Sequence, residues 1–537
     1  MQLTYNGLKD SQAWAKAGID LPSYDPQALA EHTRKSPRWI HFGIGNIFRI
    51  FVGGIADSLI RSGLMDTGII CAETFDYDVV DKIYAPFDNL ALAVTLHEDG
   101  KTDKRVLGSL TEAVKAQSSD SASWSRLKEI FSAPTLQLVS FTITEKGYAL
   151  HGADGQYFPF VNADIANGPD KVSGAMGVVA SMLFTRWKAG AAPIAMVSMD
   201  NVSQNGKKLR ESVIEMSEKW CEKNFVPADF VNWVKDEGKV AFAWTMIDKI
   251  TPRPSEDVAK MLSDSGVEDM SIVVTSKRTY IAPFVNAEAP GYLVIEDSFP
   301  NGRPPLEKAP QVYMSDRNTV NLSERMKVTA CLNPIHSALC TYDRMLGYTL
   351  FADGMHDPEL SKLAQIVGYD EGLPVVQNPG IISPHDFLKE CLEVRFPNPY
   401  LGDTSARIAT DISQGLAFRF GETVKAYAAR DGSAKNLKGI PLAIAGWLRY
   451  ILALDDDGNA FELSPDPMNA EVSAQLSGVE FGKPESLTDQ LKPILSSTHI
   501  FGVNLYDAGL GEKITDMFRE MLNGKGAVRA TLKKYLA

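Results

Sequence analysis

The segment from Arg38 to Glu73 most narrows what this chain can fold into. It reads RWIHFGIGNIFRIFVGGIADSLIRSGLMDTGIICAE. Residues 39–42 are short and apolar, as in a buried strand, and residues 68–72 resemble a second such strand. Between them, apolar residues recur at helical spacing, at Ile47, Phe51, Ile55 and Leu59. The order strand, glycine turn, helix, strand predicts a βαβ unit at the start of a parallel sheet.

Further apolar runs extend this pattern. Residues 136–143 and 193–199 resemble strands, with a helical stretch at 172–189 between them. This alternation predicts a mostly parallel sheet with helices on both faces. Weaker strand-like runs follow, and we expect them to form a mixed edge of the same sheet: 239–244, 271–276 and 290–297.

After the turn-rich residues 301–305, the periodicity is almost wholly helical. The predicted helical stretches are 321–349, 358–368, 402–428, 436–453, 485–496, 509–522 and 526–536. The fold class is therefore an α/β Rossmann-type N-terminal domain with a mostly parallel sheet, residues 1–312, followed by a predominantly α-helical C-terminal domain, residues 313–537. A chain of 537 residues is long enough for such a division.

Composition excludes several function classes. The net charge is −13 and no long Lys/Arg run is present, which argues against nucleic acid as a partner. The N-terminus has no signal-peptide pattern and no apolar run approaches about 18 residues, so we expect a cytoplasmic protein without a membrane span. The five cysteines are odd in number and scattered, so reduced thiols are expected.

Two glycines mark a candidate cofactor turn. Gly43 and Gly45 lie between the first strand and its helix, where a pyrophosphate can approach the backbone. Phe48 occupies the position of a third glycine, so the GxGxxG match is partial. Glu73, at the end of the second strand, is placed to accept hydrogen bonds from ribose hydroxyls and to repel a 2′-phosphate. These features predict NAD as cofactor; the alternative is a doubly wound domain that binds another nucleotide or none.

The run MKVTACLNPIH, residues 326–336, carries candidate catalytic groups. Hydride transfer to a carbonyl needs a proton donor and donors for the developing charge. Lys327 can supply the proton if burial lowers its pKa, the Asn333 amide can donate to the oxygen, and His336 can bind substrate or orient the lysine. Pro334 makes Asn333 a plausible start of a new helical segment. The alternative is an N-cap Asn, a surface Lys and a core His.

A second polar cluster, DNVSQNG, follows the strand 193–199. Asn201 lies at the carboxyl edge of this strand, where open α/β sheets bind ligands, and is either a turn residue or a second amide donor. Asn205 and Gly206 are predicted to form only a turn.

The chain resembles the mannitol dehydrogenase family, the polyol-specific long-chain dehydrogenases and reductases. The resemblance rests on GxGNxxR from Gly43, TExGY from Thr144, DNxxxNG from Asp200, IDKITP from Ile247, LVIED at 293–297 and the ExxK…N..H segment. It spans both predicted domains.

The resemblance implies roles for individual residues. Lys327 is the implied general acid/base, Asn201 and Asn333 the oxyanion donors, and His336 a substrate-binding or lysine-orienting group. The implied substrate contact is Asp248, and Glu324 is the implied proton relay. Asn46, Ile47, Thr144 and Glu145 belong to the motifs implied to bind cofactor. No metal is implied.

Two departures from the family pattern concern the substrate site. The family spacing between lysine and asparagine is one residue shorter, and we expect Pro334 to absorb the extra residue. The basic residues that follow an RDT-like start also differ, so Arg407 and Arg419 are the substrate-binding candidates, with Lys425 a further basic group for a carboxylate. The subgroup most resembled interconverts fructuronate and mannonate; tagaturonate reduction and mannitol oxidation are the alternatives.

Two other classes compete with a sugar-acid or polyol dehydrogenase. A metal-dependent isomerase or lyase is weakly supported, because the eight histidines form no HxH or HExxH pair. A non-catalytic dinucleotide sensor would use the same first domain. The sequence leaves open whether the protein is a monomer or a small homo-oligomer.

Overall fold

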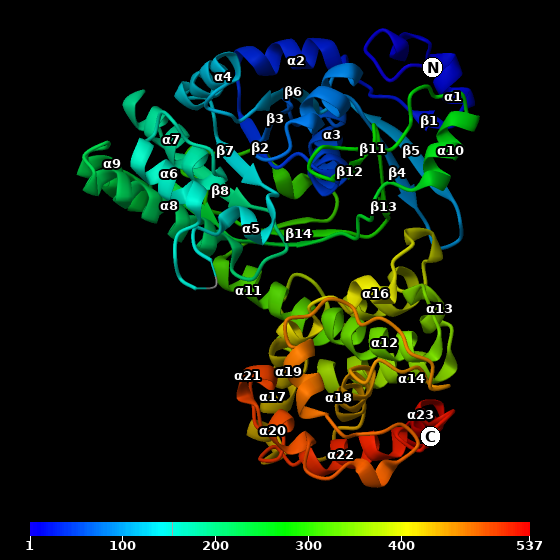
Figure 1. Ribbon diagram of the computed structural model, residues 1–537. Helices are drawn as coiled ribbons and strands as arrows, with labels where there is room; N and C mark the ends of the chain where they lie inside the picture. The colour runs from blue at the N-terminus through cyan, green and yellow to red at the C-terminus, as the bar shows by residue number, and fades with distance from the viewer. Residues whose placement is uncertain (153) are drawn as a thin grey trace. The chain divides into compact units, whose positions relative to one another are not determined.

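The computed structural model describes residues 1–152 and 154–537, which form two compact units, Met1–Asn321 and Leu322–Ala537 (Figure 1). The first unit is α/β and the second is helical, which confirms the predicted fold class. Among the described residues, no helix is both long and apolar enough to cross a membrane.

The centre of the first unit is a six-stranded, wholly parallel sheet. Its strands lie in the order β6 (Leu110–Lys115), β3 (Ile69–Glu73), β2 (Trp39–Phe42), β7 (Leu138–Phe141), β8 (Ile194–Ser198), β9 (Val240–Ala243). The chain builds outward from β2 in one direction and then from β7 in the other. The carboxyl ends of β2 and β7 therefore form the switch point at which doubly wound sheets bind nucleotides.

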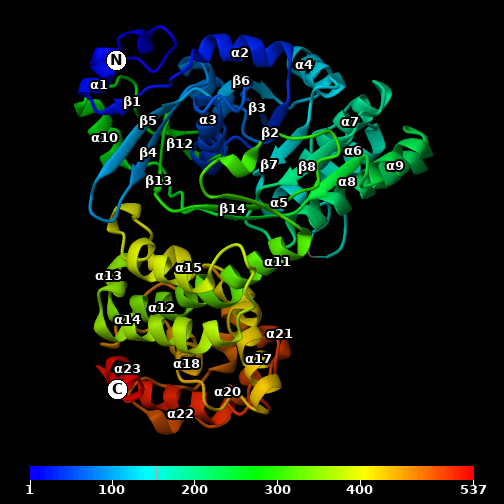
Figure 2. The ribbon, with the colours of Figure 1, turned by 180° about the vertical axis from the view of Figure 1, so that it is seen from behind.

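Alternate residues of these strands enter two cores, because successive side chains point to opposite faces. Ile40, Ile70 and Val139 pack with helices α4 (Ser121–Ser132), α7 (Ala175–Lys188), α8 (Asn205–Glu222) and α9 (Ala228–Lys235). Trp39 and Leu138 pack on the other face with the π-helical turn η2 (Phe48–Val52) and helix α3 (Gly53–Arg61). Figure 2 shows α3 beside β5 (Thr102–Leu107).

The prediction that the weaker strand-like runs form a mixed edge of this sheet is wrong. Of the three weaker runs, only β9 joins the six-stranded sheet, and it does so in parallel. The run 290–297 contributes β14 (Tyr292–Glu296), which pairs with β10 (Thr245–Asp248) and β15 (Val312–Ser315). The run 271–276 supplies β11 (Val273–Val274), which forms a hairpin with β12 (Tyr280–Ile281). A further sheet has the order β1 (Ile19–Asp20), β5, β4 (Ala91–Leu96), β13 (Phe284–Glu288).

The remaining helical elements of the first unit are short. They are η1 (Gly7–Lys9), α1 (Ser11–Lys16), α2 (Pro26–Lys35), η3 (Val80–Tyr84), η4 (Ala85–Phe87), α5 (Thr144–Tyr148), α6 (Pro159–Asn167), α10 (Glu256–Asp264) and η5 (Leu306–Lys308).

The second unit packs around two buried helices, α12 (Asn333–Leu346) and α18 (Gly439–Tyr450), which lie side by side. Every residue of α18 is buried. Helix α22 (Gly511–Met521) packs on α18, and α23 (Ala527–Leu536) packs on α22.

The other helices of this unit surround that pair. They are α11 (Arg317–Met326, which begins in the first unit), η6 (Lys327–Cys331), α13 (Phe351–Met355), α14 (Pro358–Gln365), η7 (Ile366–Gly372), η8 (Leu373–Val375), α15 (Pro384–Glu390), η9 (Cys391–Arg395), η10 (Pro399–Leu401), α16 (Ser405–Ile408), η11 (Ile412–Gly415), η12 (Ala417–Gly421), α17 (Glu422–Asp431), α19 (Asn469–Gln475), η13 (Pro484–Ser486), α20 (Leu491–Leu495) and α21 (Thr498–Phe501). The predicted helix 402–428 is thus broken, because 3-10 and π turns interrupt it before α17.

Candidate active site

The glycine turn after β2 has the geometry of a phosphate cradle. Gly43 has φ +87°, and a Cβ added there would lie 2.2 Å from the carbonyl oxygen of Thr142, so only glycine fits. Among the described residues, no atom lies within 4 Å of a Cβ added at Gly45. Gly43 therefore shapes the turn, while Gly45 leaves open space beside the start of the following helix, where a pyrophosphate fits.

Arg49, the last residue of the GxGNxxR motif, holds this turn in place. Its buried guanidinium donates to the Asn46 side chain at 2.9 Å and to the carbonyl of Ala282 at 2.7 Å. Burial lowers the pKa of Arg49 to about 10. The hydrogen bond from Arg49 thus holds the Asn46 side chain in place. Ile47, the next residue at the start of the helix, is half-buried.

Glu73 lies at the carboxyl end of β3, as predicted, but its oxygens are already engaged. One oxygen accepts the N–H groups of Thr74, Phe75 and Asp76 at 2.9–3.3 Å, and the other accepts the N–H of Ile44 at 3.3 Å. Burial raises the pKa of the carboxyl, and these N–H groups act in the opposite direction. Glu73 therefore ties the glycine turn to the loop after β3, a role that the residue type alone did not indicate.

The TExGY and DNxxxNG motifs meet through Asp200. Its carboxylate accepts the N–H groups of Ile143 and Thr144, both at 2.9 Å, and the Tyr148 hydroxyl at 2.5 Å. Thr144 has φ +63°, and this conformation aims its N–H at Asp200. Burial raises the pKa of Asp200. The two motifs thus position the carboxyl edges of β7 and β8 against each other.

The neighbours of this network differ in exposure. Asn201 follows Asp200 and is exposed at the edge of β8. Thr144 is also exposed, and Glu145 forms an ion pair with Lys208.

Asn205 is not merely a turn residue, so that prediction is wrong. It begins α8 and is fully buried. Its amide nitrogen donates to the carbonyls of Asp200 and Thr245 and to the Thr245 hydroxyl, while its oxygen accepts the N–H groups of Gly206 and Thr245. Asn205 therefore fastens the polar loop after β8 to the start of β10.

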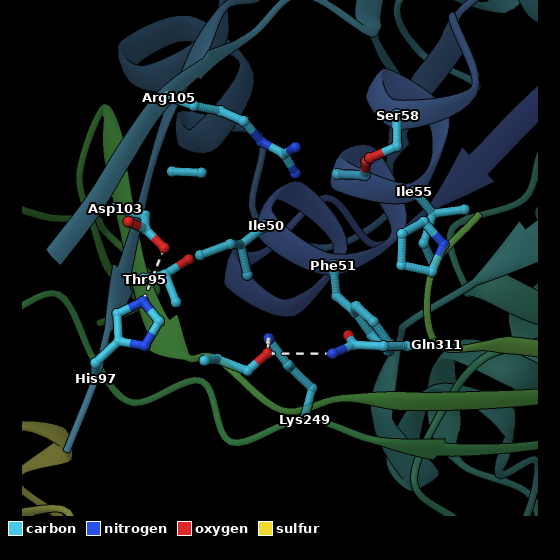
Figure 3. Close-up of a pocket in the computed structure, with 14 residues that line it drawn as sticks. Ile50, Phe51, Ile55, Ser58, Thr95, His97, Asp103, Arg105, Lys249 and Gln311 are labelled. Carbon is cyan, nitrogen blue, oxygen red and sulfur yellow. Dashed lines mark hydrogen bonds and ion pairs between the residues drawn. The ribbon is translucent and has the colours of Figure 1, made fainter. Parts of the chain in front are cut away.

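Asp248 is the last residue of β10 and is buried. The next residue, Lys249, lines a separate cavity of about 330 Å³ in the first unit (Figure 3). There the Lys249 ammonium donates to the carbonyls of Ala289 and Pro290 and lies 5.6 Å from the centre of the Phe51 ring. No residue predicted for the active site lines this cavity.

Lys327 begins a π-helical turn, η6, and is only 2% exposed. The N–H of Leu332 donates to the Lys327 carbonyl at 3.1 Å, which closes a turn with one residue more than an α-helical turn. This turn contains the additional residue between Lys327 and Asn333. The prediction that Pro334 absorbs that residue is therefore wrong.

Pro334 instead follows Asn333 in the first turn of α12, a position that suits a residue without an N–H. Asn333 starts this helix, as predicted, and its side-chain oxygen is buried without a hydrogen-bond partner among the described residues. Such an orphaned amide oxygen is uncommon in folded proteins.

His336 is held between two aromatic rings. Its ring centre lies 4.9 Å from that of Phe351 and 4.6 Å from that of Phe396. Burial lowers the pKa of His336 to about 3; Asp403 opposes this shift, and the cations Arg407, Arg419 and Arg395 add to it. The imidazole is therefore neutral near pH 7 and able both to donate and to accept a hydrogen bond.

The basic candidates in the second unit differ in their partners. Arg407 is exposed and forms a two-bond ion pair with Asp403, at 2.5 and 2.6 Å. Lys425 pairs with Glu422. Arg419 donates to the Ser337 hydroxyl at 2.7 Å, and burial lowers its pKa.

Arg395 was missed at the sequence level. It is 1% exposed, and its charge acts on His336. Arginines are mostly exposed in folded proteins, so the residue type gave no signal that Arg395 would be buried.

Glu324 lies on α11, three residues before Lys327, and is half-buried. Among the described residues, no group of three or more His, Cys, Asp or Glu side chains is arranged to hold a metal ion.

The sheet order and the glycine turn define a dinucleotide-binding oxidoreductase fold with a helical second unit. Two family models match the chain: the mannitol dehydrogenase Rossmann domain over residues 37–308 and the mannitol dehydrogenase C-terminal domain over residues 320–522. The chain belongs to the mannitol dehydrogenase family, which confirms the resemblance seen in the sequence.

Curated relatives match over nearly the whole chain. The D-mannonate oxidoreductase of Thermotoga maritima is 51% identical, with 99% of each chain covered. The D-mannonate oxidoreductase of Escherichia coli K12 is 28% identical, with 90% of this chain and 91% of that one covered.

Two solved structures share the fold. Substrate-free D-sorbitol dehydrogenase superposes with a TM-score of 0.78 at 25% identity, covering 96% of this chain and 98% of that one. Mannitol 2-dehydrogenase of Pseudomonas fluorescens, in a ternary complex with NAD and D-mannitol, superposes with a TM-score of 0.72 at 24% identity. The match covers 100% of this chain and 99% of that one.

Proposed function

We propose that this enzyme interconverts a keto-hexuronate and its aldonate with NAD, and that its reaction is the reduction of D-fructuronate by NADH to D-mannonate. The full-length, 51% identical match to a D-mannonate oxidoreductase carries the substrate class. Tagaturonate reduction and mannitol oxidation are the alternatives within the family.

The glycine turn supports the cofactor. Gly43 fixes the turn, the open space at Gly45 suits a pyrophosphate, and Asn46 and Ile47 begin the helix whose N-terminus faces it. Bound NADH would supply the hydride to the substrate carbonyl carbon. The buried charge of Glu73 disfavours a 2′-phosphate and so favours NAD over NADP.

In this proposal the protein supplies the proton and stabilises the developing charge. Lys327 donates a proton to the carbonyl oxygen as it becomes an alkoxide, and abstracts it in the reverse direction. The amides of Asn201 and Asn333 donate hydrogen bonds to that oxygen. With these donors in place, the chemistry needs no metal ion.

Three further groups support this chemistry. His336, neutral at physiological pH, hydrogen-bonds a substrate hydroxyl or orients Lys327, and Asp248 binds a second hydroxyl. Glu324 relays protons between solvent and Lys327, toward the lysine during reduction and away from it in the reverse direction.

Arg419 is the favoured partner of the substrate carboxylate. Arg407 is already bound to a carboxylate on two nitrogens, whereas the hydrogen bond of Arg419 to Ser337 goes to a neutral hydroxyl. An arginine can form a charge-assisted, two-bond contact with a sugar-acid carboxylate, which a neutral polyol cannot make.

The test is a substrate panel. Purified protein and NADH are offered fructuronate, tagaturonate and fructose separately, with and without chelator, and the absorbance of reduced nicotinamide is followed. Fructuronate should give the highest kcat/KM and the chelator should have no effect. NADH binding without oxidation by any of the three would favour the non-catalytic sensor, and activity lost to chelator and restored by metal would favour the metal-dependent class.

A further inference from the structure

Phe75 presents an exposed aromatic ring close to the end of β3. It is 65% exposed, and it follows Glu73 by two residues at the carboxyl end of β3. Its N–H is fixed by the Glu73 carboxylate at 2.9 Å, so the backbone that carries the ring is held in place. The ring has no role in either core of the six-stranded sheet.

The β11–β12 hairpin braces the loop that carries Phe75. The Thr275 hydroxyl donates to Asp76 at 2.6 Å, and the N–H of Ser276 donates to Asp78 at 3.0 Å. Lys277 of the hairpin places its ammonium 5.2 Å from the centre of the Phe75 ring. One side of the ring is thus occupied by a cation, and the exposed remainder is free to receive a flat ligand.

A dinucleotide bound at the glycine turn would place its adenine near the Phe75 ring. Its pyrophosphate belongs at Gly43 and Gly45, and its adenosine ribose belongs at the end of β3. The adenine, attached to that ribose, must then lie beyond β3, among the residues that follow Glu73. Because the oxygens of Glu73 already accept four N–H groups, hydrogen bonding to that acid contributes less than the residue type suggested.

We propose that Phe75 is the stacking platform for the adenine of the dinucleotide, with the β11–β12 hairpin holding the ring in position through Asp76, Asp78 and Lys277. This inference rests on the proposed binding of NAD and adds the residue that recognises the base. Stacking on a ring is tolerant of the cofactor's oxidation state, so NAD and NADH gain equally from it.

Calorimetric titration with NADH and with ADP-ribose tests the proposal. Phe75→Ala should weaken both ligands by the same factor, roughly ten- to a hundredfold, since a stacked base contributes of that order. Phe75→Trp should retain affinity, because it restores an aromatic face. The matched control is Phe160→Ala in α6: this ring is also exposed, at 44%, and packs on Phe158, so its loss should leave both affinities unchanged.

The possible outcomes distinguish a failure of the proposed cofactor from a failure of the proposed stacking role. Wild-type protein that binds neither NADH nor ADP-ribose refutes the proposed cofactor itself. Wild-type binding that persists within twofold in Phe75→Ala refutes the stacking role alone. Should the alanine variant unfold, Phe75→Leu replaces it, since leucine keeps apolar bulk without a ring, and unchanged affinity there also refutes the proposal.

Discussion

Replacing Gly45 by alanine separates the binding role of the glycine turn from its folding role. In the part of the chain that the structure describes, a Cβ at Gly45 meets no atom within 4 Å. A Cβ at Gly43 would lie 2.2 Å from the Thr142 carbonyl oxygen, in a backbone of φ +87°. The added methyl at Gly45 therefore fills only the space assigned to the pyrophosphate. Replacing Gly45 should therefore weaken cofactor binding with little change in stability, whereas replacing Gly43 should destabilise the fold.

The sizes of these effects follow from the geometry. Gly45→Ala should change the free energy of unfolding by less than about 1 kcal/mol, because no clash and no left-handed backbone is involved. Its NADH affinity should fall at least about tenfold, since about 1.4 kcal/mol is lost if the phosphate moves away from even one backbone N–H. Gly43→Ala should cost about 2 kcal/mol or more, from the left-handed conformation and the clash together.

Thermal unfolding and calorimetric titration on the same preparations measure both quantities. The expected result is a Gly45→Ala protein that unfolds like wild type but binds NADH weakly. Wild-type affinity in that variant would show that the open space at Gly45 is not where the pyrophosphate lies, and the cofactor placement would have to be abandoned.

Three further changes have defined outcomes. Burial, together with nearby carboxylates, raises the pKa of Asp343 to about 8 from an ordinary 3.8. Between these pH values the folded state keeps a proton that the unfolded state loses, so the stability of the wild type should fall as the pH rises. Urea titrations at several pH values should show this slope in the wild type and a flatter slope in Asp343→Asn. An unchanged slope would show that Asp343 does not titrate in this range. Asn205→Ala should lower the free energy of unfolding by about 3 kcal/mol or more, since it orphans several buried partners, and a loss below 1 kcal/mol in denaturant unfolding would contradict the network described above. Arg419→Gln should raise KM for fructuronate at least about tenfold while leaving any activity on fructose nearly unchanged. Arg407→Gln is the matched control. Equal losses on both substrates would show that Arg419 does not bind the substrate carboxylate.

The sequence predicted the doubly wound sheet because its strands are short apolar runs separated by a glycine turn and helices. The β5 strand escaped notice, since it carries charged residues such as Asp103 and Arg105 and shows no continuous apolar run. The assignment of β14 to the same sheet failed because pairing partners far apart in the sequence leave no local signal.

The candidate catalytic segment was located, but its geometry was not. An extra residue between Lys327 and Asn333 can be accommodated by a kink or by a wide turn, and residue types do not distinguish the two; the structure contains a π-helical turn. Likewise, Glu73 was predicted at the right place, but its four backbone donors depend on the path of the following loop, which the sequence does not specify.

The most direct test of the central claim is the rate of hydride transfer in Lys327→Ala, measured in single turnover with fructuronate and NADH, alongside calorimetric titration of NADH. If Lys327 is the general acid, the transfer rate should fall by about a hundredfold or more while the NADH affinity stays within about twofold of wild type. A transfer rate close to that of wild type, with fructuronate still reduced, would contradict the proposed chemistry.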